Sequence, residues 1–156
     1  MNLFLQVIFW LSLGSILSSY LLYPLMVRFF ALFKKEKKAN LIEDWPSIEV
    51  VFAAYNEESV IDKKIRSILD CDYPSDKLSI SIGSDNSCDG TNNILEAWQA
   101  KDERLKVTIF KKRQGKSAII NQLTAKTKAE FLLLTDANII FDKDLLKKLV
   151  NFGPSS

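Results

Sequence analysis

Apolar residues form one long run near the start of the chain and then short runs at regular intervals. The long run covers residues 3–27 and contains no charged residue. Four later runs have the length of strands and are continuously apolar or rich in β-branched residues; they cover residues 48–54, 78–83, 105–110 and 130–135. The pattern therefore predicts one long apolar helix followed by a series of short strands.

Between and after these strands, apolar residues recur at helical spacing. The stripes are Ile61, Ile65, Ile68 and Leu69; Ile94, Leu95 and Trp98; Ile119, Ile120 and Leu123; and Leu145, Leu146, Leu149 and Val150. Strands that alternate with helices predict a parallel sheet with helices on its faces. Ligands of such sheets bind at the carboxyl ends of the strands, so the residues that follow each strand are the candidates for a site.

The first apolar run exceeds the roughly 20 residues that cross a bilayer, and it has no polar face to suit a soluble core. A cleaved signal peptide is the alternative, but it would have a basic start, a shorter apolar region and a small-residue cleavage site. We therefore assign residues 1–33 to a transmembrane anchor, 34–47 to a basic juxtamembrane segment and linker, and 48–156 to an α/β domain.

Charge sets the expected orientation of the anchor and excludes some functions. Of the 21 Lys and Arg and 19 Asp and Glu, five bases and one acid lie between residues 28 and 38, so 16 bases and 18 acids remain beyond them. The basic cluster predicts that the domain is cytoplasmic. The acidic balance of the domain argues against a nucleic-acid partner. Without histidine the chain has no His-based triad, and its two cysteines lack metal-ligand spacing.

Polar residues follow the first and second strands. After the first strand, Asn56 can cap the next helix, and Glu57 and Glu58 suit the positive end of that helix. After the second strand, turn chemistry explains most of the sequence GSDNSCDGT, with Thr91 as a cap. Turn chemistry does not explain Asp85, which lies where the strand leaves the sheet.

The third strand is followed by GKS at residues 115–117, which resembles part of a phosphate-binding loop. That motif needs a glycine at position 110, where this chain has Phe, and no G-x-G-x-x-G follows any strand. A nucleoside-triphosphatase and a dinucleotide-binding domain are therefore rejected. Lys116 at a helix start is a candidate partner for an anion, or alternatively a solvated surface lysine.

The fourth strand is followed by Asp136, Ala137 and Asn138. Two side chains with oxygen atoms, separated by one small residue, can bind a hard cation such as Mg²⁺ together with phosphate oxygens. An Asx turn is the alternative explanation of this tripeptide, and the residues alone do not decide between the two.

Taken together, AAYNEE, SDNSCDGT, GKSAIIN and TDAN occur in an order and spacing that resemble the family-2 glycosyltransferases, which have the GT-A fold and include cellulose and hyaluronan synthases. The resemblance runs from about Pro46 to the end of the chain. It implies a GT-A (Rossmann-like) parallel sheet with flanking helices, incomplete here; the transmembrane helix predicted above from the apolar run precedes it. The implied substrate is a nucleotide-diphosphate sugar, usually with uracil as its base, and the implied acceptor is a saccharide or a lipid.

The resemblance also implies roles for particular residues. Ala54, Tyr55 and Glu58 would line the nucleotide pocket, and Asp85 would hydrogen-bond the base. The other donor-binding residues it implies are Lys116 and Asp136. A divalent cation, Mg²⁺ or Mn²⁺, would be held by Asp136 and Asn138.

Two features depart from the family pattern. Asn138 replaces the second acid of a D-x-D motif, so we expect weaker cation binding than an Asp would give. The family's general base lies in a later motif, expected beyond Ser156, so no catalytic residue is assigned and the chain is expected to be poorly stable or inactive alone. The sequence thus predicts the donor-binding part of a membrane-anchored glycosyltransferase; the alternative is a non-catalytic, membrane-tethered module that binds nucleotide sugars or a partner.

Overall fold

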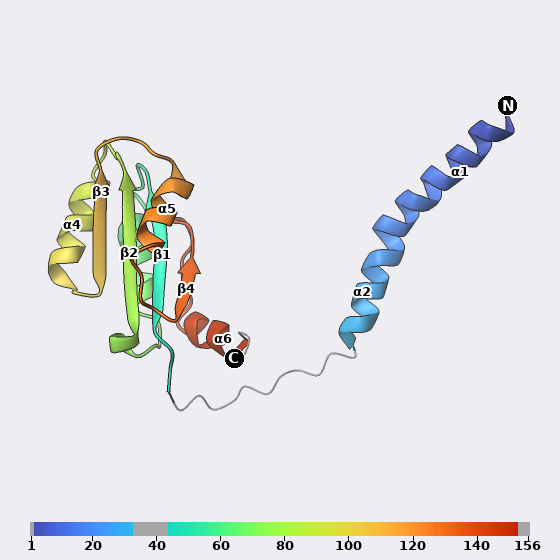
Figure 1. Ribbon diagram of the computed structural model, residues 1–156. Helices are drawn as coiled ribbons and strands as arrows, with labels where there is room; N and C mark the ends of the chain where they lie inside the picture. Colours follow the sequence, from blue (N-terminus) through green and yellow to red (C-terminus); the bar gives the residue numbers. More distant parts are fainter. Residues whose placement is uncertain (1, 33–43, 153–156) are drawn as a thin grey trace. The chain divides into compact units, whose positions relative to one another are not determined.

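The computed structural model describes residues 2–32 and 44–152, which belong to two separate units (Figure 1). The first unit is one helical run made of α1 (Leu3–Leu17), the π-helical η1 (Ser18–Leu22) and α2 (Tyr23–Leu32). Pro24 follows the π-helical turn closely. Because proline has no N–H to bond the carbonyl four residues earlier, a local change of helical winding at this point is expected.

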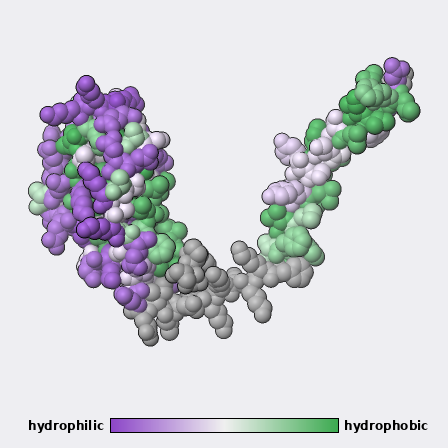
Figure 2. All heavy atoms as spheres, in the orientation of Figure 1, coloured by the Kyte–Doolittle hydropathy of each residue, from purple (hydrophilic) through white to green (hydrophobic). Residues whose placement is uncertain are grey.

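The helical run, 30 residues long, is apolar and long enough to cross a membrane, and none of its residues is buried. Figure 2 shows apolar residues along most of its visible face. This agrees with the helix predicted from the sequence. The basic residues used to predict its orientation, apart from Arg28, lie outside the described residues.

The second unit contains a parallel sheet with strand order β3-β2-β1-β4 (Figure 1). Its strands are β1 (Ile48–Ala54), β2 (Leu78–Asp85), β3 (Leu105–Phe110) and β4 (Phe131–Leu134). The predicted parallel α/β sheet is confirmed. β2 is two residues longer than predicted, because Ser84 and Asp85 still pair with the end of β3.

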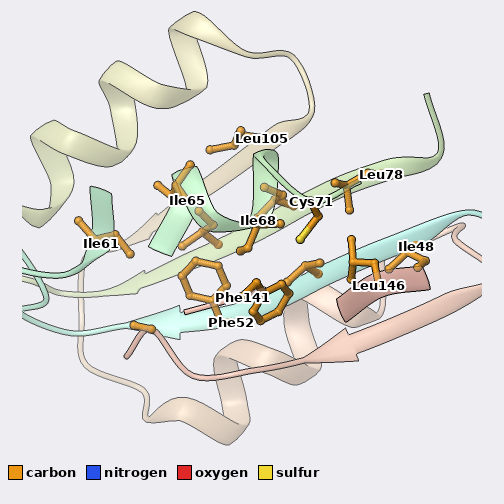
Figure 3. Close-up of a cluster of buried hydrophobic side chains, with 14 of the residues drawn as sticks. Ile48, Phe52, Ile61, Ile65, Ile68, Cys71, Leu78, Leu105, Phe141 and Leu146 are labelled. Atoms are coloured by element: carbon orange, nitrogen blue, oxygen red, sulfur yellow. The ribbon is translucent and has the colours of Figure 1, made fainter. Parts of the chain in front are cut away.

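Helices cover both faces of the sheet. They are α3 (Ile61–Leu69), α4 (Thr91–Lys101), α5 (Lys116–Thr124) and α6 (Leu145–Phe152), with a short 3₁₀ turn, η2, at Ser75–Lys77. Side chains of β1 alternate between the two faces, as the pleat of a strand requires. Phe52 packs with α3 and Phe141 on one face (Figure 3), and Val51 packs with Ile119 and Leu123 of α5 on the other.

One close approach depends on glycine. A Cβ on Gly83 of β2 would lie 2.2 Å from Cγ2 of Ile119, so α5 lies as close to the sheet as it does because residue 83 has no side chain. This contact brings the first residue of α5, Lys116, to the carboxyl edge of the sheet.

β4 is an edge strand in the described part of the chain, since it pairs there with β1 alone. Its side chains Phe131, Leu132 and Leu134 are 39%, 42% and 56% exposed.

Candidate functional site

A cleft opens at the carboxyl edge of the sheet, where parallel strands bring their ends together. β1 ends at Ala54 and β2 at Asp85, and β4 leads directly into Thr135 and Asp136. The cleft has a volume of about 340 Å³. The predicted site residues that line it are Ala54, Tyr55, Asp85, Lys116, Asp136 and Asn138. Four segments that are far apart in sequence therefore meet around one cavity.

Asp85 lies at the base of this cleft and is only 4% exposed. Its two carboxylate oxygens accept hydrogen bonds from the backbone N–H groups of Gln114 (2.7 Å) and Gly115 (3.0 Å). Each carboxylate oxygen has a second lone pair. Asp85 can therefore hold the loop between β3 and α5 in place and still accept a hydrogen bond from a ligand.

The same loop contributes a residue that the sequence analysis missed. The guanidinium of Arg113 lies 3.9 Å from the ring centre of Tyr55, and its Nε lies 4.0 Å from a carboxylate oxygen of Asp85. Gly115 has φ +86°, a left-handed conformation that favours glycine. The position of Arg113, two residues before GK, was the available sequence signal, but its contact with Tyr55 depends on the fold.

Lys116 and Asp136 form an ion pair across the cleft. Both side chains are more than half exposed, so the pair contributes little to stability. It lies between the first cleft and a second one of about 410 Å³, because both residues line both cavities. The pair brings one cation and one carboxylate to the place where the two clefts meet.

Asn56 and Glu58 bond to the loop after β2. Asn56 has φ +53° and does not cap α3, which begins after Val60. Its side-chain oxygen accepts a hydrogen bond from the N–H of Cys88 (2.9 Å). The carboxylate of Glu58 accepts a hydrogen bond from the N–H of Gly90 (2.8 Å), and Glu58 is not among the residues that line this cavity, so its predicted contact with the nucleotide stays a prediction. Glu57, which was not predicted as a site residue, lines the cavity.

Thr91 is also placed differently from the prediction. It is the first residue of α4, whose cap position is Gly90, and its hydroxyl donates to Asp89 (2.6 Å) while accepting from the N–H of Glu57 (2.9 Å). The hydrogen bond from the Thr91 hydroxyl lowers the pKa of Asp89 below its usual value. Side chains of the loop after β1 thus accept hydrogen bonds from backbone N–H groups of the loop after β2, and Thr91, after the second loop, accepts one from the first.

The possible cation ligands in the cleft are Asp136 and Asn138. Both are exposed, and Asp136 already faces the Lys116 ammonium. No group of three or more His, Cys, Asp or Glu able to hold a metal occurs among the described residues. One carboxylate and one amide oxygen are hard ligands that fit Mg²⁺ or Mn²⁺ only if a bound ligand supplies further oxygen atoms.

The strand order, with Asp85 at the end of β2 and Asp136 after β4, is that of a GT-A domain, and the structural neighbours reported below share this fold. The chain belongs to glycosyl transferase family 2, whose family model matches residues 49–152. This confirms the family and the fold inferred from the four motifs.

Similarity to known proteins is strong over a limited length. The chain is 34% identical to a beta-monoglucosyldiacylglycerol synthase of Synechocystis over 71% of its own length and 24% of that protein. A mannosyltransferase of Pyrobaculum calidifontis, solved with GDP-Man and Mn²⁺, aligns with a TM-score of 0.72 at 24% identity, covering 88% of this chain and 42% of that one. TarS of S. aureus, solved with UDP-GlcNAc, aligns with a TM-score of 0.61 at 26% identity, covering 68% of this chain and 30% of TarS. The chain thus spans about a quarter of the length of its first curated relatives.

Proposed function

We propose that the cleft binds a nucleotide-diphosphate sugar and that the chain is the donor-binding part of a membrane-anchored glycosyltransferase. The observation that carries this proposal is the meeting of Asp85 and Asp136, from the ends of β2 and β4, in one cleft of a family-2 domain. The acceptor we propose is a saccharide or a lipid. The glycolipid synthase among the relatives supports this acceptor, and the nucleotide sugars bound by the structural neighbours support the donor.

The cleft offers different chemistry at its two ends. Ala54, Tyr55 and Asp85 form an end with an aromatic ring and a buried acceptor, suited to a nucleoside. Lys116 and Asp136 form a charged end, suited to a diphosphate. The Lys116 ammonium can transfer from Asp136 to a phosphate oxygen, which would release Asp136 for another partner.

That partner is a divalent cation, Mg²⁺ or Mn²⁺, held by Asp136 and Asn138 together with the diphosphate of the donor. When bound, such a cation neutralises charge on the leaving diphosphate. Asn138 contributes an oxygen without a charge, so the affinity of the chain for the cation alone should be low. The Mn²⁺ bound with GDP-Man in the structural neighbour supports this assignment.

We propose UDP as the nucleotide, following the family resemblance. Titration calorimetry of the 156-residue chain in detergent with UDP and with GDP, with and without Mn²⁺, tests this directly. UDP with Mn²⁺ should bind more tightly than GDP, and Asp85→Ala and Asp136→Ala should abolish binding, whereas Asp76→Ala, a change at an exposed residue of η2, should leave it unchanged. Undiminished binding by both variants would overturn the site.

A second candidate is a module that binds the nucleotide sugar without transferring it. It is favoured by Asn138, which leaves one carboxylate at the proposed cation site. Incubation with labelled UDP-sugar and Mn²⁺ tests this second candidate. Release of UDP or transfer of the label would exclude the module, whereas binding without either is expected both of the module and of the donor-binding part of a transferase alone.

The helix from Leu3 to Leu32 is the proposed anchor, with the domain on the cytoplasmic side. Cys88 is exposed and Cys71 is buried, and these are the two cysteines of the chain. A membrane-impermeant maleimide should therefore label Cys88 only after permeabilisation of the cells, with Cys88→Ser as the control. Labelling of intact cells would reverse the orientation.

A further inference from the structure

Lys64 is a completely buried lysine on the sheet-facing side of α3. It occupies the apolar stripe of the helix, three residues after Ile61 and next to Ile65, where a hydrophobic residue is the usual choice. No ion pair joins it to a carboxylate in the part of the chain that the structure describes. A buried ammonium without a counter-ion is costly, so its contacts need an explanation.

The ammonium of Lys64 binds the segment that follows β4. It donates hydrogen bonds to the hydroxyl of Thr135 (3.1 Å) and to the backbone carbonyl of Ile139 (2.5 Å). Its third side faces the ring of Phe141, whose centre lies 3.8 Å away. These three contacts account for the three N–H groups of the ammonium.

The two hydrogen bonds enclose the proposed cation ligands. Thr135 directly precedes Asp136, and Ile139 directly follows Asn138, so Lys64 holds the turn at both of its ends. The turn is closed by a hydrogen bond from the N–H of Ile139 to the carbonyl of Asp136 (3.3 Å).

Ser67, one turn further along α3, supports the same segment. Its hydroxyl donates to the carbonyl of Lys64 (2.8 Å) and accepts from the N–H of Phe141 (3.1 Å). Hydrogen bonds from α3 therefore fix the segment from 135 to 141, and Asp136 and Asn138 of the same segment line the cleft.

We propose that Lys64 is a positioning residue that fixes the orientation of Asp136 and Asn138 and thereby sets how strongly the site binds a cation and a diphosphate. This proposal rests on the proposed function and adds to it a residue that touches no ligand. Residues that orient metal ligands from behind typically change metal affinity by about 10- to 100-fold when they are replaced.

Lys64→Met is the informative variant. Methionine fills a similar volume between Phe52 and Phe141 and removes the buried charge, so the fold should persist. The carbonyl of Ile139 and the hydroxyl of Thr135 lose their donor, which frees the turn. Lys63→Met is the matched control, because Lys63 is exposed and adjacent in sequence.

The test compares two probes by calorimetry on the 156-residue chain in detergent: UDP with Mn²⁺, and uridine alone. Uridine reaches only the nucleoside end of the cleft, so Lys64→Met should leave its affinity unchanged and weaken UDP with Mn²⁺ about tenfold or more. Lys63→Met should change neither. Lys64→Arg, which keeps the donors, should recover part of the loss.

Other outcomes overturn the proposal in distinguishable ways. Equal affinity of the parent and Lys64→Met for UDP with Mn²⁺ would show that Lys64 positions nothing. Parallel loss of uridine and UDP binding, together with a lower unfolding midpoint, would show a purely structural role. If the parent binds neither UDP nor GDP, the proposed function fails, and the role of Lys64 fails with it.

Discussion

Replacement of Asp85 by Asn tests whether this carboxylate braces the loop between β3 and α5. In the parent, the two carboxylate oxygens of Asp85 accept hydrogen bonds from the N–H groups of Gln114 and Gly115. The Asn side chain has one acceptor oxygen, so one of these N–H groups must face an amide NH₂ or turn to water. A hydrogen bond to a charged acceptor contributes about 1.5–3 kcal/mol, and we expect a loss of about 2 kcal/mol in Asp85→Asn.

Hydrogen exchange measures this loss at the two amides concerned. Since 1.4 kcal/mol is a factor of ten, about 2 kcal/mol corresponds to roughly thirtyfold faster exchange of Gln114 or Gly115. Asp76→Asn, at an exposed aspartate, is the control and should exchange like the parent. Unchanged protection of both amides in Asp85→Asn would refute the bracing role, whatever the variant does to nucleotide binding.

Three further predictions concern residues around the cleft. Glu58→Ala removes the acceptor of the Gly90 N–H, so the free energy of unfolding should fall by about 1 kcal/mol in urea titrations. UDP affinity should change less than about threefold, and a larger loss of affinity would make Glu58 a ligand contact. Gly83→Ala places a Cβ 2.2 Å from Ile119 and should cost about 1–3 kcal/mol in the same assay, and an unchanged midpoint would contradict the close packing of α5. Burial lowers the pKa of Lys64 from 10.5 to about 8. Between these two pH values the unfolded chain holds more protons than the folded one, so the free energy of unfolding should rise with pH there. Between pH 8 and pH 9 the gain should be about 1 kcal/mol relative to Lys64→Met, and identical pH dependences of parent and variant would disprove it.

The strands and helices could be predicted because their signal is local. The runs at residues 48–54 and 105–110 match β1 and β3 in both bounds, and the apolar stripes identify the sheet-facing sides of the helices. The end of β2 was missed by two residues, because Ser84 and Asp85 carry no apolar signal. Their place in the strand follows from pairing with β3, which local sequence does not contain.

The contacts of the loops could not be predicted in the same way. Asn56 and Thr91 are good helix caps by residue type, and each was assigned to its own helix. In the structure they bond across to one another's loops, Asn56 to Cys88 and Thr91 to Glu57. Such partners are more than 30 residues apart, and only the parallel pairing of β1 with β2 brings them together.

Lys64 shows a signal that was present but not used. A lysine within the stripe formed by Ile61, Ile65 and Ile68 breaks the apolar pattern of α3, and a polar residue at a core position is often paired with a buried polar partner. The anomaly was visible in the sequence. The identity of the partner, the turn after β4 more than 70 residues away, was not.

The motif residues around the cleft therefore divide into two groups that an activity assay alone would confuse. Asp136 and Tyr55 face the cavity, and their partners are Lys116, through an exposed ion pair, and Arg113, through a cation–π contact. Such exposed contacts contribute little to stability, so the loss of Asp136 or Tyr55 should reduce affinity with little change in stability. Glu58 and Asn56 brace one loop against another, so their loss should appear first in stability. Asp85 belongs to both groups, because it lines the cavity and holds the loop before α5. A fall in binding by Asp85→Ala identifies a ligand contact only if the loop remains protected in that variant, which is why exchange at Gln114 and Gly115 has to be measured beside affinity.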